Sequence, residues 1–320
     1  MVISAAVGDY SHVEGWGNLA TAKATHVEGK NTQATETYAH AEGRSTKATA
    51  YAAHAEGRLT TASAQTAHAE GYSTTASGGE GSHAEGYGTE ATNSSAHAEG
   101  RETHATGYRA HAEGLRTTAS GNNAHSEGED TVASGNNSHS EGKGAVASSE
   151  EAHAEGYLTT ASGAKGSHAE GQSTLALGES SHAEGGFTEA RGNYCHAEGK
   201  GTVAGKEAIY NSDGTTTWGT DFAHAEGEDT QALGYSSHAE GTVTLAKMQS
   251  AHSEGQYTIA GGYRSHAEGL RTVASGNNSH SENENTTASG QDSHAGGYYS
   301  TSSGACSFTH GRYLNATQDS

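Results

Sequence analysis

Imidazole and carboxylate groups, which can transfer protons and bind metal ions, recur along this sequence at a fixed spacing. Twenty of the 22 histidines share one frame, and a glutamate stands two residues later in nineteen of those twenty cases. Each framed histidine follows the last by fourteen positions, except that one position is added at two places (68 to 83 and 153 to 168) and the interval doubles from 196 to 224. Side chains two positions apart on a strand point to the same face. Each repeat is therefore predicted to present an imidazole beside a carboxylate.

We call the surface formed by the framed histidines and the glutamates that follow them the His/Glu face. These two columns stay constant along the chain, whereas the position between Thr and Ala in each repeat varies widely, from Lys47 and Glu90 to Leu175. This contrast predicts that the His/Glu face packs against another chain. The candidate interface residues are His40, Glu42, His54, Glu56, His68, Glu70, His83, Glu85, His97, Glu99, His111, Glu113, His153, Glu155, His168, Glu170, His182, Glu184, His238, Glu240, His266 and Glu268.

Other chemistries fit the pattern less well. A metal site needs a few ligands with defined support, whereas these groups form an unbroken series. We therefore expect His/Glu hydrogen bonding, no metal and no cofactor, with occasional capture of a metal ion or anion as the alternative. The letters Ser-His-x-Glu resemble a catalytic triad, but Ser and His alternate faces on one strand. No catalytic residue is expected and the chain is predicted not to be an enzyme, although a depolymerase site between subunits stays open.

The elements that must position these groups follow from the repeat, which reads x-x-Ser-His-Ala-Glu-Gly and then x-x-Thr-x-Ala-Ser-Gly. Each heptad suits a short strand and a tight turn, and the absence of proline fits a backbone paired almost throughout. Small residues before each histidine, such as Ser82 and Ala96, and the Thr-x-Ala residues Thr89 and Ala91 are predicted to point inside. An inward threonine column disfavours ice binding. The fold class predicted is all-β, a β-solenoid built from repeats of fourteen positions that each contain two short strands.

Composition sets limits on partners and on stability. The net charge of −21 disfavours nucleic acid and anionic membranes as partners, and no stretch has the length for membrane insertion. Cys195 and Cys306 are too far apart in sequence to suggest a disulfide framework. Only 31% of the residues are hydrophobic, so a single solenoid lined by Ala, Ser and Thr buries little apolar area against the entropy of ordering. Self-association along one face is expected to supply the missing burial.

The unit Ser-His-Ala-Glu-Gly-x-x-Thr-x-Ala-Ser-Gly resembles the head repeat of trimeric autotransporter adhesins of the YadA type, Ser-Val-Ala-Ile-Gly-x-x-Ser-x-Ala-x-Gly. The resemblance covers residues 4 to about 311 apart from 206–220. It implies a left-handed parallel β-roll in a homotrimer, with the Val and Ile columns facing the threefold axis. Here His83 and Glu85, or His153 and Glu155, stand in those places. The His-Ala-Glu-Gly variant also looks like repeat arrays in phage tail fibres and appendages, where the array often precedes a self-cleaving domain.

The segment 206–223 interrupts the repeat. Two interpretations stay open, a degenerate turn with a bulged hairpin or a protruding loop in which Tyr210, Trp218 and Phe222 contact a receptor or glycan. The predicted organisation is β-roll repeats over 1–205 and 224–311, with this segment between them. Residues 312–320 are expected to be a tail that leads to a separate C-terminal element.

These observations predict an extracellular structural and host-attachment segment, either the shaft of a phage tail fibre or, as the alternative, the head of a bacterial surface adhesin. The partner expected is the chain itself, with a host-surface glycan or receptor as a candidate ligand. Stacked glutamates at strand spacing would repel one another by roughly 3 kcal/mol per pair at an effective dielectric near 20, so imidazolium beside each is expected to offset this. That pairing predicts a raised histidine pKa in the fold and greatest stability in mild acid to neutral solution.

Overall fold

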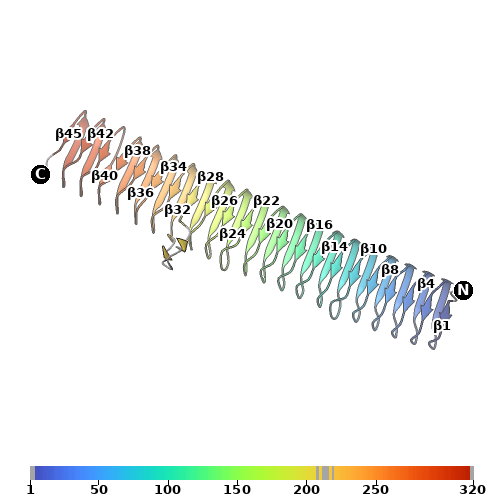
Figure 1. The fold of residues 1–320 in the computed structure, drawn as a ribbon. Coiled ribbons are helices and arrows are strands. Elements are labelled where there is room, and N and C mark those ends of the chain that lie inside the picture. Colours follow the sequence, from blue (N-terminus) through green and yellow to red (C-terminus); the bar gives the residue numbers. More distant parts are fainter. Residues whose placement is uncertain (1–3, 207–208, 211–215, 218–219, 318–320) are drawn as a thin grey trace. The chain divides into compact units, whose positions relative to one another are not determined.

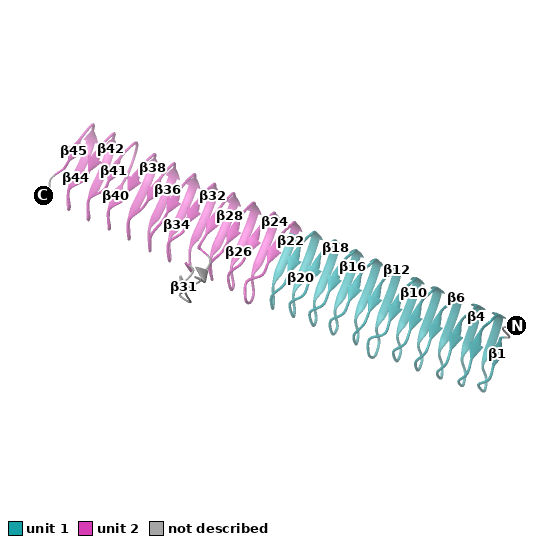
Figure 2. Cartoon of the chain, viewed as in Figure 1, with its two compact units in different colours: residues 1–155 teal, residues 156–320 magenta. Residues whose placement is uncertain are grey.

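The structure is a computed structural model that describes residues 4–206, 209–210, 216–217 and 220–317. The chain divides into two compact units, Met1–Glu155 and Gly156–Ser320 (Figure 2). In the described residues all regular elements are strands, and no helix there has the length and apolar character needed to cross a membrane.

Each turn in unit 1 contributes a strand that begins at a framed histidine and a two-residue strand that ends at an alanine. The first kind comprises β2 (His12–Trp16), β4 (His26–Lys30), β6 (His40–Arg44), β8 (His54–Arg58), β10 (His68–Tyr72), β12 (His83–Tyr87), β14 (His97–Arg101), β16 (His111–Leu115), β18 (His125–Glu129) and β20 (His139–Lys143). The second kind comprises β1 (Ala5–Ala6), β3 (Leu19–Ala20), β5 (Gln33–Ala34), β7 (Lys47–Ala48), β9 (Thr61–Ala62), β11 (Thr75–Ala76), β13 (Glu90–Ala91), β15 (His104–Ala105), β17 (Thr118–Ala119), β19 (Val132–Ala133) and β21 (Val146–Ala147).

Unit 2 repeats this alternation, except that its last strand of the first kind begins at Phe308 and one strand of the second kind ends at Ser302. β22 (His153–Tyr157) contains residues of both units. The unit 2 strands of the first kind are β24 (His168–Gln172), β26 (His182–Gly186), β28 (His196–Lys200), β32 (His224–Glu228), β34 (His238–Thr242), β36 (His252–Gln256), β38 (His266–Leu270), the shorter β40 (His280–Ser281), β42 (His294–Tyr298) and β44 (Phe308–Arg312). Those of the second kind are β23 (Thr160–Ala161), β25 (Leu175–Ala176), β27 (Glu189–Ala190), β29 (Val203–Ala204), β33 (Gln231–Ala232), β35 (Leu245–Ala246), β37 (Ile259–Ala260), β39 (Val273–Ala274), β41 (Thr287–Ala288), β43 (Thr301–Ser302) and β45 (Asn315–Ala316).

Neighbouring turns pair in parallel and in register, and within each unit the strands follow one another in chain order (Figure 1). In unit 1, His83 lies beside His97, and in unit 2, His238 lies beside His252. The extra residue between His68 and His83 is absorbed in a turn, because these two histidines still pair. The predicted parallel β-solenoid, with one repeat of fourteen positions and two strands in each turn, is confirmed.

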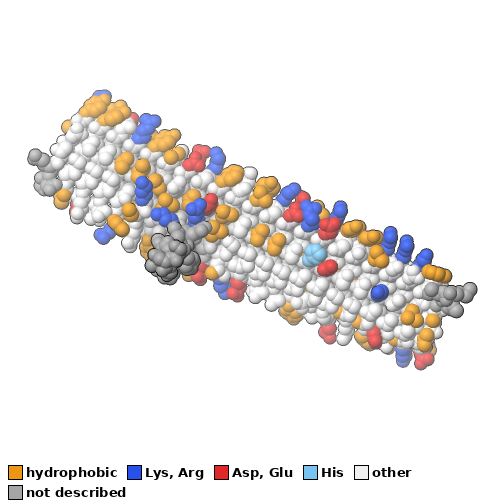
Figure 3. All heavy atoms as spheres, in the orientation of Figure 1, with side chains coloured by type: hydrophobic (Ala, Val, Ile, Leu, Met, Phe, Trp, Pro, Cys, Tyr) orange, Lys and Arg blue, Asp and Glu red, His pale blue; other side chains and the backbone are white. Residues whose placement is uncertain are grey.

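The interior of each turn is built from small side chains, as the repeat predicts. Ser82 is 1% exposed, and Ala84, Thr89 and Ala91 are fully buried. Alternation along a strand sends the residues between them outward. The variable position is exposed at Lys47 but only half-buried at residues such as Leu175 and Ile259. On the face that Figure 3 shows, hydrophobic and charged side chains are scattered and almost no histidine is visible.

The doubled interval between His196 and His224 contains no additional turn of the solenoid. β28 pairs directly with β32, which places His196 beside His224. Between these strands, Lys206 and Thr220 form an antiparallel bridge, and β30 (Ile209–Tyr210) pairs antiparallel with β31 (Thr216–Thr217). The segment therefore has its own antiparallel pairing, as a hairpin would, and lies between two turns that pair directly with each other. At the other end, β45 pairs with β43, so the last turn extends past residue 311.

The turns use the left-handed backbone region at positions that are often not glycine. Leu59, Glu102 and Arg116 have φ values of 61°, 56° and 55°. A non-glycine residue in this conformation costs roughly 1–2 kcal/mol. Neighbouring turns offset this cost through backbone hydrogen bonds, such as the one that the Leu59 amide donates to the Arg44 carbonyl. Glycine is required at the last position of His-Ala-Glu-Gly for a different reason. Gly86 has φ +117°, and a Cβ added there would overlap the carbonyl oxygen of Gly100.

Candidate interface of stacked histidine and glutamate

The His/Glu face lies on the outer surface of the strands that begin at the framed histidines. In β12 the His83 and Glu85 side chains are 34% and 47% exposed, whereas Ala84 between them is buried. The same arrangement holds in the other turns that carry both His and Glu, so the candidate residues form two columns within each unit. The predicted outward placement of His and Glu is confirmed.

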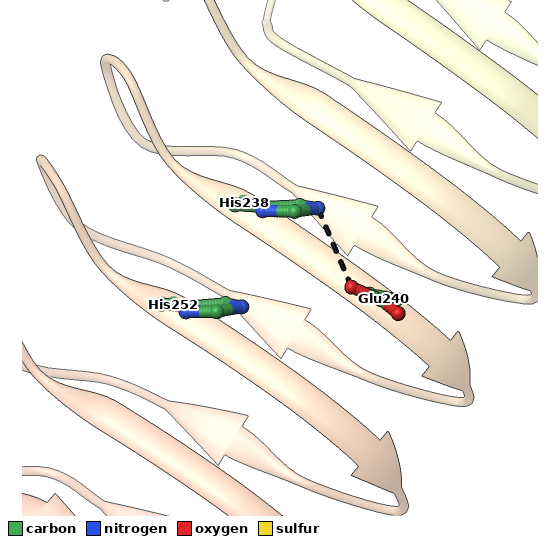
Figure 4. Close-up of side chains that lie close together, drawn as sticks. All are labelled: His238, Glu240 and His252. Carbon is green, nitrogen blue, oxygen red and sulfur yellow. Dashed lines mark ion pairs between the residues drawn. The ribbon is translucent and has the colours of Figure 1, made fainter.

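Consecutive imidazoles stack along the solenoid. Within each unit the ring centroids of neighbouring framed histidines are 4.6–5.0 Å apart. In Figure 4 the rings of His238 and His252 lie parallel on adjacent strands, with a centroid distance of 4.9 Å and an interplanar angle of 3°. Glu240 lies beside His238 farther along the same strand, with its Oε2 3.9 Å from the His238 Nε2. Each column thus continues from turn to turn at strand spacing.

Hydrogen bonding between His and Glu is looser than the sequence predicts. In ordinary turns the His Nε2 and Glu Oε2 atoms are 3.4–3.9 Å apart, and the His182–Glu184 pair at 3.4 Å is within hydrogen-bond distance. Among the described residues, Nε2 of His83, His97 and His111 is buried and has no hydrogen-bond partner. A buried polar atom without a partner is unfavourable, so closer His–Glu contact is expected to stabilise the face.

The pairing changes near the end of unit 2. From His266 onwards, the imidazole pairs with the glutamate of the preceding turn and not with the glutamate of its own strand. The His266 Nε2 atom lies 4.0 Å from Glu254 Oε2. His280 Nε2 lies 3.2 Å from Glu268 Oε1, and His294 Nε2 lies 3.1 Å from an oxygen of Glu282. These last two are hydrogen bonds between turns. The regular spacing of the sequence carries no signal for this change.

The expectation of a raised histidine pKa is wrong for the chain by itself. Burial lowers the pKa of His97 below its ordinary value, and repulsion from the stacked imidazoles of His111 and His83 lowers it further. The carboxylates Glu99 and Glu85 act in the opposite direction but with smaller effect. The pKa is lowered for the same first cause, burial, at His68, His83, His125, His224, His252 and His266. Stacking therefore favours neutral imidazole over imidazolium.

The residues proposed for a ligand loop are not brought together by the described part of the chain. Trp218 and the side chain of Tyr210 lie outside the described residues. Phe222 is in the turn before β32, where its ring stacks on Tyr194 at 5.2 Å and meets Tyr235 edge-on at 5.5 Å. We call this exposed group the aromatic cluster. It was not predicted, because the insertion separates Tyr194 from Phe222 in sequence and hides that they occupy neighbouring turns.

A second feature that sequence reasoning missed is a shallow groove on the outer surface of the short strands in unit 2. It is lined by Val243, Leu245, Tyr257 and Ile259, with Asp229 at one side. Parallel register places Leu245 beside Ile259. The variable position of the repeat is therefore locally apolar here, and this grouping is visible only once the turns are aligned.

The turns of both units also match a known repeat. Four segments, 98–124, 126–148, 169–188 and 253–279, match the family model described as YadA head domain repeat (2 copies). These segments, which together make up less than a third of the chain, are similar to that repeat. No curated protein is similar enough to the chain to count as a match.

Similarity to this repeat accounts for the buried pattern of the matched segments but not for the His/Glu face. The matched segments include His111 and Glu113 in unit 1 and His266 and Glu268 in unit 2. Their alanines and threonines fill the interior as the repeat requires. The outward columns carry His and Glu, and so differ from the Val and Ile that the resemblance leads us to expect.

Proposed function

We propose that the chain is a structural and attachment segment of an extracellular fibre, in which three copies associate through their His/Glu faces. The observation that carries the proposal is that half-buried imidazoles and carboxylates form two columns on one face of each unit, as in the turns of His83, His97 and His111. The outward position of the other sheet varies in type from turn to turn. When identical chains associate through one surface, that surface is expected to keep the same residue types in every repeat while the other surface varies. The repeats over 1–205 and 224–311 supply this surface.

Energetics support association. The interior of each turn is filled by Ala, Ser and Thr, and such side chains bury little apolar area to offset backbone ordering. Contact between three chains would remove the remaining exposed imidazole and alkyl surface from water. It would also bring neutral, stacked histidines of one chain near carboxylates of another, which gives buried Nε2 atoms and their glutamates a reason to close to hydrogen-bond distance.

The mass of the chain in solution tests this proposal. We expect light scattering after gel filtration to give about three times the chain mass of 32.5 kDa at micromolar concentration. Changing His97, His111 and His125 to Arg places three permanent charges in one column of the His/Glu face. Since like charges at this spacing repel by roughly 3 kcal/mol per pair, this variant is expected to run as a monomer or unfold.

The matched control places the same three charges on the other sheet of the same turns. His104, Thr118 and Val132 lie on β15, β17 and β19, in register with one another. Their replacement by Arg is expected to leave the mass at three chains. A monomeric wild-type chain, or equal loss of association in both variants, would refute the interface.

Within this proposal the fibre is the shaft of a phage tail fibre or appendage. Support comes from the His-Ala-Glu-Gly form of the repeat, which resembles such arrays. Tail genes and a chaperone domain encoded beside the chain are expected in this case, whereas a membrane anchor would indicate a bacterial adhesin.

The adhesin alternative, a head that binds host or matrix ligands, has its own support in the aromatic cluster. Tyr194, Phe222 and Tyr235 are 49%, 49% and 45% exposed, and exposed aromatic groups are typical of binding hot spots. Changing all three to Ala is expected to lower binding to host-cell glycans at least tenfold, measured on glycan arrays and intact cells. As a control, Ala at the edge-on pair Tyr38 and Tyr51 should leave binding unchanged. Unchanged binding in the triple variant would exclude this cluster as the ligand site.

A further inference from the structure

The last turns of unit 2 break the His/Glu pattern in one place. β42 carries Gly296 where the other framed turns carry glutamate, and β44 carries His310 at the same position. The position aligned with Gly296 in the preceding turn is Glu282, whose amide hydrogen-bonds to the carbonyl of Ala295. The column of glutamates therefore ends at Glu282, and the next two turns carry Gly296 and His310 at the same position. This leaves one carboxylate facing an imidazole from each of the two following turns.

The geometry of these three side chains differs from an ordinary turn. Oε1 of Glu282 lies 3.1 Å from Nε2 of His294 and 3.5 Å from Nδ1 of His310, and the three atoms are all within 4.8 Å of one another. The ring of His294 is turned by 71° relative to His280, whereas His266 and His280 are parallel within 1°. His294 has thus left the stack and directs its Nε2 toward Glu282.

These distances match those between ligands of one metal ion. Zinc binds His nitrogen and carboxylate oxygen at about 2.0–2.1 Å in tetrahedral geometry, which places neighbouring ligand atoms about 3.3 Å apart. We propose that Glu282, His294 and His310 form a binding site for a divalent transition metal such as zinc, with water as the fourth ligand. Two imidazoles and one carboxylate are a donor set that zinc uses with an open fourth position. His310 is 56% exposed, so water can reach that position.

Gly296 and Phe308 shape this site. A Cβ at Gly296 would lie 2.5 Å from Nδ1 of His310 and 2.7 Å from Oε1 of Glu282, so only glycine leaves the space between the ligands free. Phe308 takes the place of a framed histidine, with its ring 4.9 Å from that of His294 and 6.4 Å from that of His310. The Phe308 ring thus lies beside both imidazoles and restricts the room in which they can turn. Glu282 is only 23% exposed, which strengthens its attraction for a cation.

The regular turns contain the same residue types, but their geometry suits a metal ion less well. His238, Glu240 and His252 also lie within 4.8 Å of one another, but Glu240 is 3.9 Å from His238 and both rings are held in the stack. A metal there would have to pull an imidazole away from its neighbours. The expectation of no metal suits these turns, and the proposed site departs from it only where the stack is broken. All three ligands come from one chain, so the site goes beyond the proposed trimer and does not depend on it.

Zinc titration of the full chain by calorimetry, near neutral pH, tests the site. We expect one Zn²⁺ per chain in the tightest class of sites. Glu282→Gln and His310→Ala are each expected to weaken that class at least tenfold. Gly296→Ala retains every ligand but fills the space between them, so it should weaken binding equally. The matched control Glu99→Gln, in a regular turn, should bind Zn²⁺ as the wild type does.

Co²⁺ in place of zinc gives a second readout, because tetrahedral Co²⁺ absorbs strongly in the visible range. The wild type is expected to show this absorption and Glu282→Gln to lose it while its far-UV circular dichroism stays unchanged. Wild-type binding in both Glu282→Gln and Gly296→Ala would overturn the proposal. So would an equal loss in Glu99→Gln, which would assign the metal to the regular columns. Mass measured with and without Zn²⁺ reports on the trimer separately.

Discussion

Replacing Gly86 by alanine is expected to lower the free energy of unfolding by about 3 kcal/mol or more. Gly86 has φ +117°, a backbone conformation that L side chains rarely adopt, and an added Cβ would overlap the carbonyl oxygen of Gly100 in the next turn. That carbonyl belongs to the parallel ladder between β12 and β14, so the ladder must open to make room. Each turn contacts only its neighbours, and one opened turn therefore uncouples the repeats on either side. Urea unfolding followed by far-UV circular dichroism measures the effect.

Gly88 provides the control for Gly86. It also has positive φ, +66°, but the nearest atom to an added Cβ is Glu102 Cγ at 3.6 Å, an ordinary contact. Asparagine tolerates this left-handed conformation, so Gly88→Asn is expected to change the free energy of unfolding by less than about 1 kcal/mol. If Gly86→Ala unfolded at the same urea concentration as Gly88→Asn, close contact between turns would not be what requires glycine.

Acidification from about pH 8 to about pH 5.5 is expected to lower the melting temperature by roughly 5 °C or more. His68, His83, His97 and His125 of the His/Glu face have a lowered pKa in the fold, first because of burial and then because of neighbouring imidazoles. As the pH falls, these histidines therefore bind protons at a higher pH in the unfolded chain than in the folded chain. Stability is fully present above the unfolded pKa near 6.5 and is lost as pH falls through that value toward the folded pKa. Charged histidines paired with carboxylates would instead raise the melting temperature on acidification.

The groups around one histidine show why the effect accumulates. His97 faces the imidazoles of His83 and His111 and the carboxylates of Glu85 and Glu99. A proton on one ring disfavours a proton on the next, because the centroids are 4.7 and 4.8 Å apart. The protonation of His97 is therefore coupled to that of its two neighbours. These imidazoles are about one third exposed, so solvent screening keeps each contribution well below the roughly 1.4 kcal/mol per pH unit of one full proton.

Glutamine in place of His83, His97, His111 and His125 tests the assignment, since glutamine does not titrate. The melting temperature of this variant is expected to vary less between about pH 8 and about pH 5.5 than that of the wild type. His104→Gln, on the other sheet, should retain the wild-type pH dependence. A wild-type melting temperature that rises on acidification would show that the imidazoles are charged and paired with carboxylates.

Much of the fold was predictable because the repeat carries it. A regular period with small residues at alternate positions permits one arrangement in which Ala84, Thr89 and Ala91 are inside and His83 and Glu85 are outside. Period-two alternation determines the face of each side chain without reference to distant residues. For the same reason the columns of the His/Glu face could be predicted residue by residue.

The tertiary structure decided what depends on the distance between turns. Left-handed residues such as Leu59 and Arg116 carry no glycine signal, because hydrogen bonds to the neighbouring turn impose their conformation. The direct pairing of His196 with His224 was hidden by the insertion between them. Stacking at strand spacing reversed the expected histidine pKa, since burial and like neighbours outweigh the adjacent carboxylate.

The solenoid, its two-strand turn and the outward columns could be predicted because they follow from local alternation repeated many times. How those columns pair, and that Glu282, His294 and His310 meet where the pattern breaks, emerged from the fold. Each of these properties depends on separations of a few ångströms between turns. Sequence spacing determines the face on which a side chain lies but not those separations.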